Sequence, residues 1–329
     1  MHPAAITLLP ALPAGYSARS GGATDVDAYL AIVQRIDQAC VGESASTREE
    51  CLDDLTAATL DDQRGCVVVE GPGGEAVAVM NCFNELQHGR GLFADTFIDP
   101  EVSPVVADQV ADALVATAKA YAQSICDGLP GVQPLVKTAL YANDRAFRGA
   151  LERAGFERHR VHWRMRIDHG SAPVPITLPR GVRLRSHDGS EGDWRSAHLV
   201  LNTAFADYYD FHPRPYATWM EEMTSPLHRV DLWRFATVDD VVVGACVRNL
   251  RYASNGFGYI SALGVLSEHR GRGIAKALLA DAFTADAAQG RRATLLHGDS
   301  TNPTGAMGLY EAMGMQADRE YLAFRHTGS

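Results

Sequence analysis

The 329-residue sequence predicts an α/β protein built from two copies of one unit. Residues 12–20, LPAGYSARS, are matched by residues 178–186, LPRGVRLRS, and an acidic turn and an amphipathic helix follow each of them. Residues 143–156 are matched in the same way by residues 302–315, with Asn, Glu and Gly in equivalent places. Because the start and the end of the pattern both recur in order, the sequence indicates that a whole unit is duplicated.

A proline-containing connector, DHGSAPVPITLP, lies between the copies at residues 168–179. Segments of this composition commonly link domains. We therefore expect an N-terminal domain at residues 1–170 and a C-terminal domain at residues 171–329.

Hydrophobic periodicity predicts the same elements in both copies. Turn residues separate the paired strands, as GPGG in the first copy and VDD in the second. The expected helices are 27–40 and 47–60 in the first copy and 193–205 and 216–223 in the second; the expected strand pairs are 66–71 with 75–83, and 232–238 with 241–250.

Composition excludes several classes of protein. The formal net charge of −10 argues against a broad nucleic-acid or anionic-membrane surface. No apolar run approaches the roughly 20 residues that a membrane span needs, and the N-terminus lacks the basic start of a secretion signal. None of the six cysteines forms a C-x-x-C pair, which favours thiols in a reducing compartment. We expect a cytoplasmic protein, monomeric or homodimeric, with no nucleic-acid or membrane partner.

The stretch with the clearest chemical meaning is a strand–turn–helix junction in the second copy. An apolar strand at residues 259–265 is followed by Arg270-Gly271-Arg272-Gly273-Ile274-Ala275, which opens an amphipathic helix. Backbone N–H groups at a helix start have no partner within the helix and attract anions, and glycines let the backbone approach the ligand closely. A Walker loop would need a terminal Lys-Ser/Thr, and a dinucleotide fingerprint would need a third glycine where Lys276 stands. A different phosphate-bearing ligand is therefore expected.

The pattern Arg270-x-x-Gly273-x-Ala275, preceded by Leu263-Gly264-Val265, resembles the coenzyme A loop R/Q-x-x-G-x-G/A of the GCN5-related N-acetyltransferases, the GNAT superfamily. Asn302, Ala306, Leu309-Tyr310-Glu311 and Gly314-Met315 resemble a second segment of that superfamily, N-x-x-A/G…LYE-x-x-GF. The resemblance extends over nearly the whole chain, but its specific motifs lie within residues 258–315. It implies two tandem GNAT-like domains, each an α/β (α+β) unit with a mixed, mostly antiparallel twisted sheet flanked by helices. This architecture is similar to that of the mycothiol synthase-like acetyltransferases.

The resemblance also implies a reaction and its residues. Acetyl-CoA would be the co-substrate, and no metal is expected. Tyr310 matches the residue that protonates the departing thiolate, and a backbone N–H near Leu263–Val265 would polarise the thioester carbonyl. The residues expected to contact coenzyme A are Leu263, Gly264, Val265, Arg270, Gly271, Arg272, Gly273, Ile274, Ala275 and Asn302.

The general base and the acceptor pocket are less specific in the sequence. His297 and Asp299 lie two residues apart, on the strand expected after the helix that follows the glycine loop. They could face an opening between this strand and the one before the loop; the alternative is that His297 is an ordinary polar residue at a strand end. Residues 206–219 are rich in aromatic and acidic side chains, which suit a cationic amine. The expected acceptor contacts are Asp207, Tyr208, Tyr209, His212 and Trp219, and the alternative is that these aromatics only pack the helices.

The first copy lacks these features. It has FIDPEVSPVVADQV where the second has the glycine loop, and Leu151 where the second has Tyr310. Val105, Val106 and Asp108 would crowd or repel an anion there. We therefore expect a degenerate first domain with a structural or substrate-shaping role and a catalytic second domain. The expected activity is N-acetyl transfer to a small-molecule amine. The alternatives are a protein or peptide amine acceptor, a non-catalytic acyl-CoA sensor, and a transferase that uses aminoacyl-tRNA. The glycine loop at residues 270–275 and the negative net charge of the chain argue against the aminoacyl-tRNA alternative.

Overall fold

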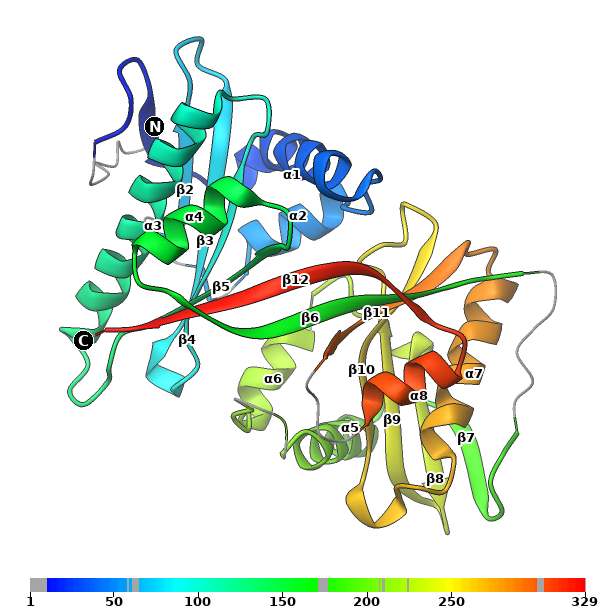
Figure 1. Ribbon diagram of the computed structural model, residues 1–329. Coiled ribbons are helices and arrows are strands. Elements are labelled where there is room, and N and C mark those ends of the chain that lie inside the picture. Colours follow the sequence, from blue (N-terminus) through cyan, green and yellow to red (C-terminus); the bar gives the residue numbers. More distant parts are fainter. Residues whose placement is uncertain are drawn as a thin grey trace. The chain divides into compact units, whose positions relative to one another are not determined.

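The computed structural model describes residues 11–57, 59–60, 65–170, 177–206, 208, 211–223, 225–300 and 305–328. The chain forms two compact units (Figure 1): the first comprises Met1–His162 and Glu320–Ser329, and the second comprises Trp163–Arg319. The expected division was a single boundary between residues 170 and 171. The structure instead places the boundary after His162 and assigns Glu320–Ser329, at the C-terminal end of the sequence, to the first unit.

Two long strands explain the difference. Strand β6 (Glu157–Asp168) begins in the first unit and ends in the second, whereas β12 (Gln316–Thr327) begins in the second and ends in the first. In the first unit, β12 pairs antiparallel with β5 (Leu135–Tyr141), from Tyr321 opposite Tyr141 to Thr327 opposite Leu135. The last strand of the chain therefore completes the first sheet, which a division into two continuous segments cannot represent.

The first unit is a mixed sheet with helices on both faces. Its strand order is β1-β2-β3-β4-β5-β12; β4 and β5 are parallel, and the other neighbours are antiparallel. Helices α1 and α2 pack around Tyr29 and Ile32, and α3 and α4 pack around Leu114 and Leu151 in a separate core. The remaining elements are β1 (Ser17–Ser20), the 3₁₀ turn Ala23–Asp25, α1 (Val26–Val41), α2 (Arg48–Leu55), β2 (Cys66–Glu70), β3 (Ala76–Glu85), the 3₁₀ turn Leu86–His88, β4 (Gly91–Ile98), α3 (Pro104–Cys126) and α4 (Arg145–Arg153).

The second unit repeats this plan with strand order β6-β11-β10-β9-β8-β7. Strands β10 and β11 are parallel, and β7, β8, β9 and β10 pair antiparallel. One core contains Leu278 and Phe283 of α7, and another contains Trp219 and Trp233 beneath α5 and α6. The elements are β7 (Val182–Ser186), α5 (Glu191–Ala204), α6 (Tyr216–Met223), the 3₁₀ turn Val230–Leu232, β8 (Arg234–Val238), β9 (Val241–Asn249), β10 (Phe257–Val265), the 3₁₀ turn Ser267–His269, α7 (Ile274–Ala288), β11 (Ala293–Asp299) and α8 (Ala306–Ala312).

The fold predicted from the sequence is confirmed: each unit is a mixed, mostly antiparallel sheet flanked by helices. All six cysteines lie in described segments and are thiols rather than disulfides. Within the described residues, none of the helices has both the length and the apolar character that a membrane crossing would need.

A buried polar network anchors α7 to the sheet of the second unit. Arg248 on β9 donates a 2.7 Å hydrogen bond to Asp286 on α7, and Thr294 on β11 donates one of 2.6 Å to the same carboxylate. A Cβ atom on Gly258 would lie 1.8 Å from Asp286 Oδ2, so the absence of a side chain there makes room for the carboxylate. Breaking such a buried pair leaves an uncompensated charge, which is strongly destabilising. The network thus fixes where α7 lies on the sheet.

We predict that Phe324→Ala destabilises the first unit, although residue 324 lies close to the end of the chain. Phe324 is only 2% exposed and belongs to the α3–α4 core of the first unit. Its truncation should cost about 3–5 kcal/mol of unfolding free energy. All four tryptophans, Trp163, Trp194, Trp219 and Trp233, lie in the second unit. Denaturation followed by far-ultraviolet circular dichroism should therefore shift, whereas tryptophan fluorescence should shift much less.

The matched control is Leu296→Ala, because Leu296 is also 2% exposed but lies in the α7 core of the second unit. This variant should move the fluorescence transition. Equal shifts of both signals in Phe324→Ala would contradict the assignment of β12 to the first unit.

Candidate functional site

The site begins at a bulge in β10. Ile260 lies opposite Arg248 and Ala262 lies opposite Val247, so Ser261 is an extra residue without a partner on β9. Side chains alternate between the faces of a strand, and one extra residue reverses that alternation. Ile260 before the bulge and Val265 after it, an odd number of positions apart, consequently lie in the same core beside α7.

Beyond the bulge, β10 and β11 stop pairing. Their parallel ladder runs from Phe257 opposite Ala293 to Ile260 opposite Leu296, while the strands themselves continue to Val265 and Asp299. The carboxyl ends of two parallel strands therefore lie free of each other. Ligands in open α/β sheets commonly bind at such an edge.

The loop after β10 leads into an uncapped helix. Gly271 and Gly273 have left-handed backbone angles, with φ of 73° and 85°, and Gly273 is the N-cap of α7 without a side-chain cap. The backbone N–H groups of residues 271–276 donate no hydrogen bond to any acceptor in the described part of the chain. Lys276 is exposed on the first turn of α7. Free N–H groups, the helix dipole and a nearby cation together form a binding site for an anion.

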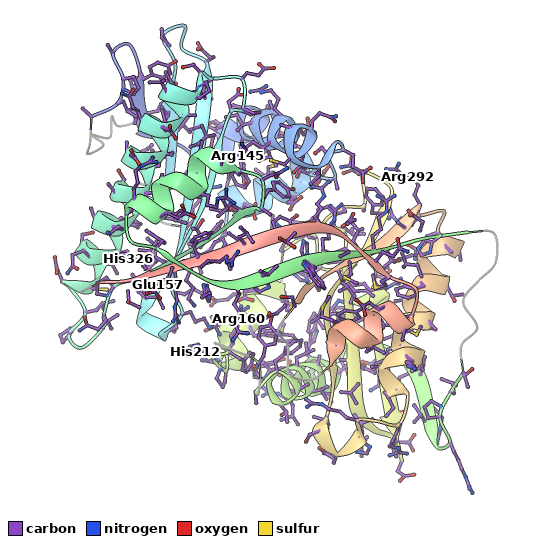
Figure 2. All side chains as sticks on the ribbon, viewed as in Figure 1. Arg145, Glu157, Arg160, His212, Arg292 and His326 are labelled. Carbon is purple, nitrogen blue, oxygen red and sulfur yellow. The ribbon has the colours of Figure 1, made fainter. Side chains whose placement is uncertain are left out.

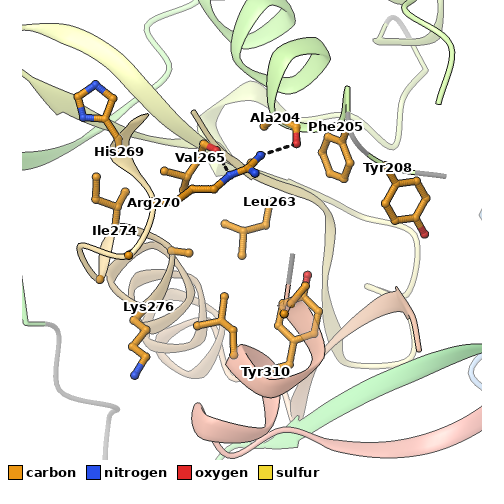
Figure 3. Close-up of a pocket in the computed structure, with 17 residues that line it drawn as sticks. Ala204, Phe205, Tyr208, Leu263, Val265, His269, Arg270, Ile274, Lys276 and Tyr310 are labelled. Atoms are coloured by element: carbon orange, nitrogen blue, oxygen red, sulfur yellow. Dashed lines mark hydrogen bonds between the residues drawn. The ribbon is translucent and has the colours of Figure 1, made fainter. Parts of the chain in front are cut away.

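The two arginines of the loop differ in their contacts. Arg270 donates from Nε to the carbonyl of Val265 at 3.0 Å and from Nη2 to the carbonyl of Ala204 at 2.8 Å (Figure 3). Arg272 is exposed, and its Nη1 lies 3.2 Å from His269 Nδ1. Both arginines are expected from the sequence to contact coenzyme A; in the structure the Arg270 guanidinium is directed to backbone carbonyls.

Tyr310, on α8, is only 9% exposed, and its hydroxyl points into a cleft toward Leu263 in Figure 3. Burial above all, together with the nearby Cys246 and Tyr208, raises the pKa of Tyr310 to about 12. The phenol consequently remains protonated throughout the physiological pH range and is available as a proton donor.

The anion site and Tyr310 line the same cleft, which has a volume of about 420 Å³. It is bounded by the end of α5, the end of β10, the glycine loop, the start of α7 and helix α8, all within the second unit. The predicted coenzyme A contacts that line it are Leu263, Gly264, Val265, Arg270, Gly271, Gly273, Ile274 and Ala275. Asn302, the remaining predicted contact apart from Arg272, lies outside the described residues.

The two candidates for the general base do not line this cleft. His297 is exposed and its Nδ1 lies 3.0 Å from the hydroxyl of Tyr259, whereas Asp299 is 2% exposed. Between them, a Cβ on Gly298 would lie 3.4 Å from the ring of Tyr310. His297 therefore belongs to the opposite face of β11 from Tyr310, at the point where the β10–β11 ladder has ended.

The expected acceptor residues are divided by the structure. Tyr208 lines the cleft. Trp219 is 7% exposed and packs against Trp194 and Trp233, with ring centroids 5.9 and 6.2 Å away, so it belongs to the α5–α6 core. His212 lies in the segment between α5 and α6 (Figure 2) and does not line the cleft. Asp207 and Tyr209 are outside the described residues.

The residues that sequence reasoning missed in this region include Phe205, Lys276 and Tyr259. Phe205, which follows α5 directly, lines the cleft, as does Lys276. Tyr259 contacts His297. The position of Lys276 in the first turn of α7 was a usable signal, since a cation there lies beside the free N–H groups. The direction of Phe205 and Tyr259 depends on the register of α5 and β10, which composition does not reveal.

The equivalent junction in the first unit is closed. Ser103 caps α3 by accepting a hydrogen bond from the N–H of Val106, and Pro104, which has no N–H, occupies the first turn. Leu151, in the place of Tyr310, is 1% exposed within the core. In the described residues of the first unit, this junction thus has a side-chain cap and a proline where the second unit has the glycine loop, and a leucine where the second unit has the phenol.

A group of His187, Asp188 and Asp193 near the start of α5 has the composition of a cation site. Both oxygens of Asp193, however, accept hydrogen bonds of 2.6 Å from Arg185, and Nδ1 of His187 accepts one from the N–H of Gly189. These lone pairs therefore accept hydrogen bonds within the turn before α5 instead of coordinating a cation. Arg19 and Asp25 form the corresponding ion pair in the first unit, which supports a structural role.

Comparisons with known proteins agree with this geometry. Residues 197–315 match the model of the Acetyltransferase (GNAT) family. The crystal structure of a GCN5-related N-acetyltransferase from Sphaerobacter thermophilus is 27% identical, covers 96% of each chain and has a TM-score of 0.81. A tandem GNAT protein from the clavulanic acid biosynthesis pathway is 14% identical, with a TM-score of 0.67 over 95% of this chain and 99% of that one. A comparison with curated proteins gave no match.

The match to the family model falls entirely within the second unit and includes the glycine loop and Tyr310. The two structural matches extend over both units, and the second of them shows the tandem fold alone. Residues 197–315 of the second unit therefore match the GNAT family of acetyltransferases, and the chain as a whole is similar to structures with the tandem GNAT fold.

Proposed function

We propose that the protein is an acyl-CoA-dependent N-acyltransferase that transfers the acetyl group of acetyl-CoA to a primary amine of a small molecule. The observation that carries this proposal is a cleft in the second unit, which joins the uncapped start of α7 to the protonated Tyr310. One end suits a pyrophosphate and the other suits a departing thiolate.

The residues present fit the donor. We assign the pyrophosphate to the backbone N–H groups of residues 271–276, with Lys276 supplying a positive charge. Residues 263–265 follow the bulge of β10 and line the cleft, and we assign to a backbone N–H there the polarisation of the thioester carbonyl.

The transfer itself requires two proton movements. The amine nitrogen attacks the thioester carbon, a C–N bond forms, and the C–S bond breaks. Tyr310 donates its proton to the sulfur. The amine loses its proton to water. We keep His297, whose Nδ1 lies 3.0 Å from the hydroxyl of Tyr259, as the candidate for the final proton acceptor; because it does not line the cleft, it contacts neither the amine nor the thioester in this proposal. Asp299 is too deeply buried to be assigned a direct step.

The acceptor faces aromatic side chains in this proposal. Phe205 and Tyr208 line the cleft, and an aromatic wall suits a cationic amine. One structural neighbour is described as a glucosamine N-acetyltransferase region of a fungal multi-domain enzyme, but it is 14% identical and shows only a shared fold. The similarity to mycothiol synthase-like enzymes, the cytoplasmic location, and a monomeric or homodimeric state remain predictions.

A library of small amines incubated with the protein and acetyl-CoA, with release of free thiol as the signal, tests the proposal. Turnover with small amines supports it. Turnover only with peptides would favour the protein-amine alternative. Tight acetyl-CoA binding without thiol release for any amine would favour a sensor.

Gly273→Asp should greatly weaken coenzyme A binding. The substitution places a negative charge among the free N–H groups at the start of α7, where the pyrophosphate is assigned. Loss of a charge-assisted contact together with repulsion should cost about 2–4 kcal/mol of binding free energy. Isothermal titration calorimetry with coenzyme A measures this cost.

Gly290→Asp is the matched control, because Gly290 lies just beyond the other end of α7 and also has a left-handed backbone, with φ of 73°. Both variants should lose about 1–2 kcal/mol of stability from this backbone strain. Only Gly273→Asp should lose binding. Normal affinity in Gly273→Asp would place the anion elsewhere.

One coenzyme A should bind per chain. The start of α7 is open, whereas Ser103 and Pro104 close the start of α3. Calorimetry should give a stoichiometry near one, and the Gly273→Asp variant should retain no second site. Two sites of comparable affinity would contradict a degenerate first unit.

Tyr310→Phe should lower kcat by about 10²–10⁴-fold and change the KM for acetyl-CoA little, since the lost proton donor acts mainly in the transition state. Burial raises the pKa of Tyr310 to about 12, so deprotonation of this phenol should not reduce the wild-type rate between pH 7 and about 10. Initial rates across that range measure both effects.

Leu151→Tyr in the Tyr310→Phe background is the control and should restore no activity, because no anion site accompanies Leu151 in the first unit. A wild-type rate for Tyr310→Phe at every pH would show that the thiolate leaves without help from this phenol.

A further inference from the structure

We propose that Arg270 is a positioning residue, which holds the aromatic wall of the cleft against the end of β10, rather than a ligand of the donor phosphates. This inference rests on the proposed function. It starts from the observation that the Arg270 guanidinium joins two backbone carbonyls from segments far apart in the sequence, those of Ala204 and Val265.

The carbonyl of Ala204 needs such a partner. Ala204 is the last residue of α5, and the final carbonyls of a helix accept no hydrogen bond from an N–H group of the same helix. The following backbone N–H groups bond elsewhere: Phe205 to Leu201, and Tyr208 to Phe205. A cationic donor at a helix C-terminus is also favoured by the helix dipole. Arg270, from the loop that follows β10, thus satisfies this helix end.

The two segments are unusually close. A Cβ on Gly264 would lie 2.9 Å from the Cβ of Ala204 and 3.4 Å from Leu201. Real Cβ atoms do not approach so closely, so the missing side chain of Gly264 permits the contact that Arg270 then fixes. The same Arg270 side chain holds Val265, the neighbour of Gly264.

The consequence reaches the reacting end of the cleft. Phe205 follows Ala204 directly, and Tyr208 is tied to Phe205 by its backbone hydrogen bond of 2.8 Å. Both line the cleft, and Tyr208 contributes to the raised pKa of Tyr310. Release of Ala204 would therefore loosen the wall that faces Tyr310.

A phosphate role would conflict with this arrangement. If the Arg270 side chain turned to an anion, it would leave the carbonyls of Ala204 and Val265 without these donors, which costs free energy when the carbonyls are covered. The free N–H groups of residues 271–276 and Lys276 already supply the donors and the charge that an anion needs.

The decisive experiment compares acetyl-CoA with acetyl-pantetheine, a donor that has the same thioester but no phosphate. Arg270→Ala should lower kcat/KM by about 10- to 100-fold with acetyl-CoA, because small displacements of positioning groups have effects of this size. The same factor should appear with acetyl-pantetheine. Arg270→Lys retains a positive charge but cannot span both carbonyls, and it should restore little.

Lys276→Ala is the matched control for a phosphate contact. Its loss should appear with acetyl-CoA and vanish with acetyl-pantetheine. Arg183→Ala, which removes an exposed arginine paired with Asp240 at 3.5 Å, should leave both donors unaffected. The proposal is overturned if the Arg270→Ala defect disappears with acetyl-pantetheine, or if Arg270→Lys restores acetyl-CoA turnover fully.

Hydrogen exchange separates failure of this inference from failure of the proposed function. In Arg270→Ala, backbone amides of residues 201–208 should exchange faster, while those in the middle of α7 should be unchanged. This readout needs no substrate. Unchanged exchange at 201–208 would overturn the positioning role even in an active enzyme, whereas faster exchange in a protein without transferase activity would contradict only the proposed function.

Discussion

The second unit depends on a helix that begins without a cap. At Gly273 the chain turns into α7 through a left-handed backbone, and no side chain takes up the first N–H groups. A serine or aspartate cap would stabilise such a helix by about 1 kcal/mol. The helix forms without that contribution because Leu278 and Phe283 are fully buried and Asp286 is paired with Arg248. Tertiary packing thus leaves the helix start available to a ligand.

The first unit shows the opposite use of the same junction. Ser103 and Pro104 complete the start of α3, which favours the helix and removes the anion site. Leu151 likewise fills the core where Tyr310 faces a cleft in the second unit. Each change is favourable for stability and incompatible with thioester chemistry. At this junction, therefore, the two copies of one fold differ in that the residues of the first complete its packing and those of the second leave room for a ligand.

Local features were predictable from the sequence, and nonlocal ones were not. The spacing of Gly271 and Gly273 predicted the loop and α7, since turn chemistry and helical periodicity act over a few residues. The assignment of β12 to the first unit escaped prediction because the pairing partner of a strand is not encoded in its own pattern. For the same reason, residue type identified Arg270 and Trp219 as candidates but not the direction of their side chains, which packing determines.

Taken alone, the raised pKa of Tyr310 is a disadvantage for a proton donor, because a pKa of about 12 makes the phenol a weak acid. Its surroundings change the comparison. Cys246, in the same core as Tyr310, is a thiol whose pKa burial also raises to about 12. Desolvation penalises a thiolate and a phenolate alike. A sulfur that leaves beside Tyr310 in a cleft that covers it would be more basic than in water by the same mechanism. The pKa values of the phenol and of the leaving thiol would then lie closer together. The low polarity around Tyr310 thus keeps the phenol protonated, and in the proposed reaction it would also increase the need of the leaving sulfur for a proton.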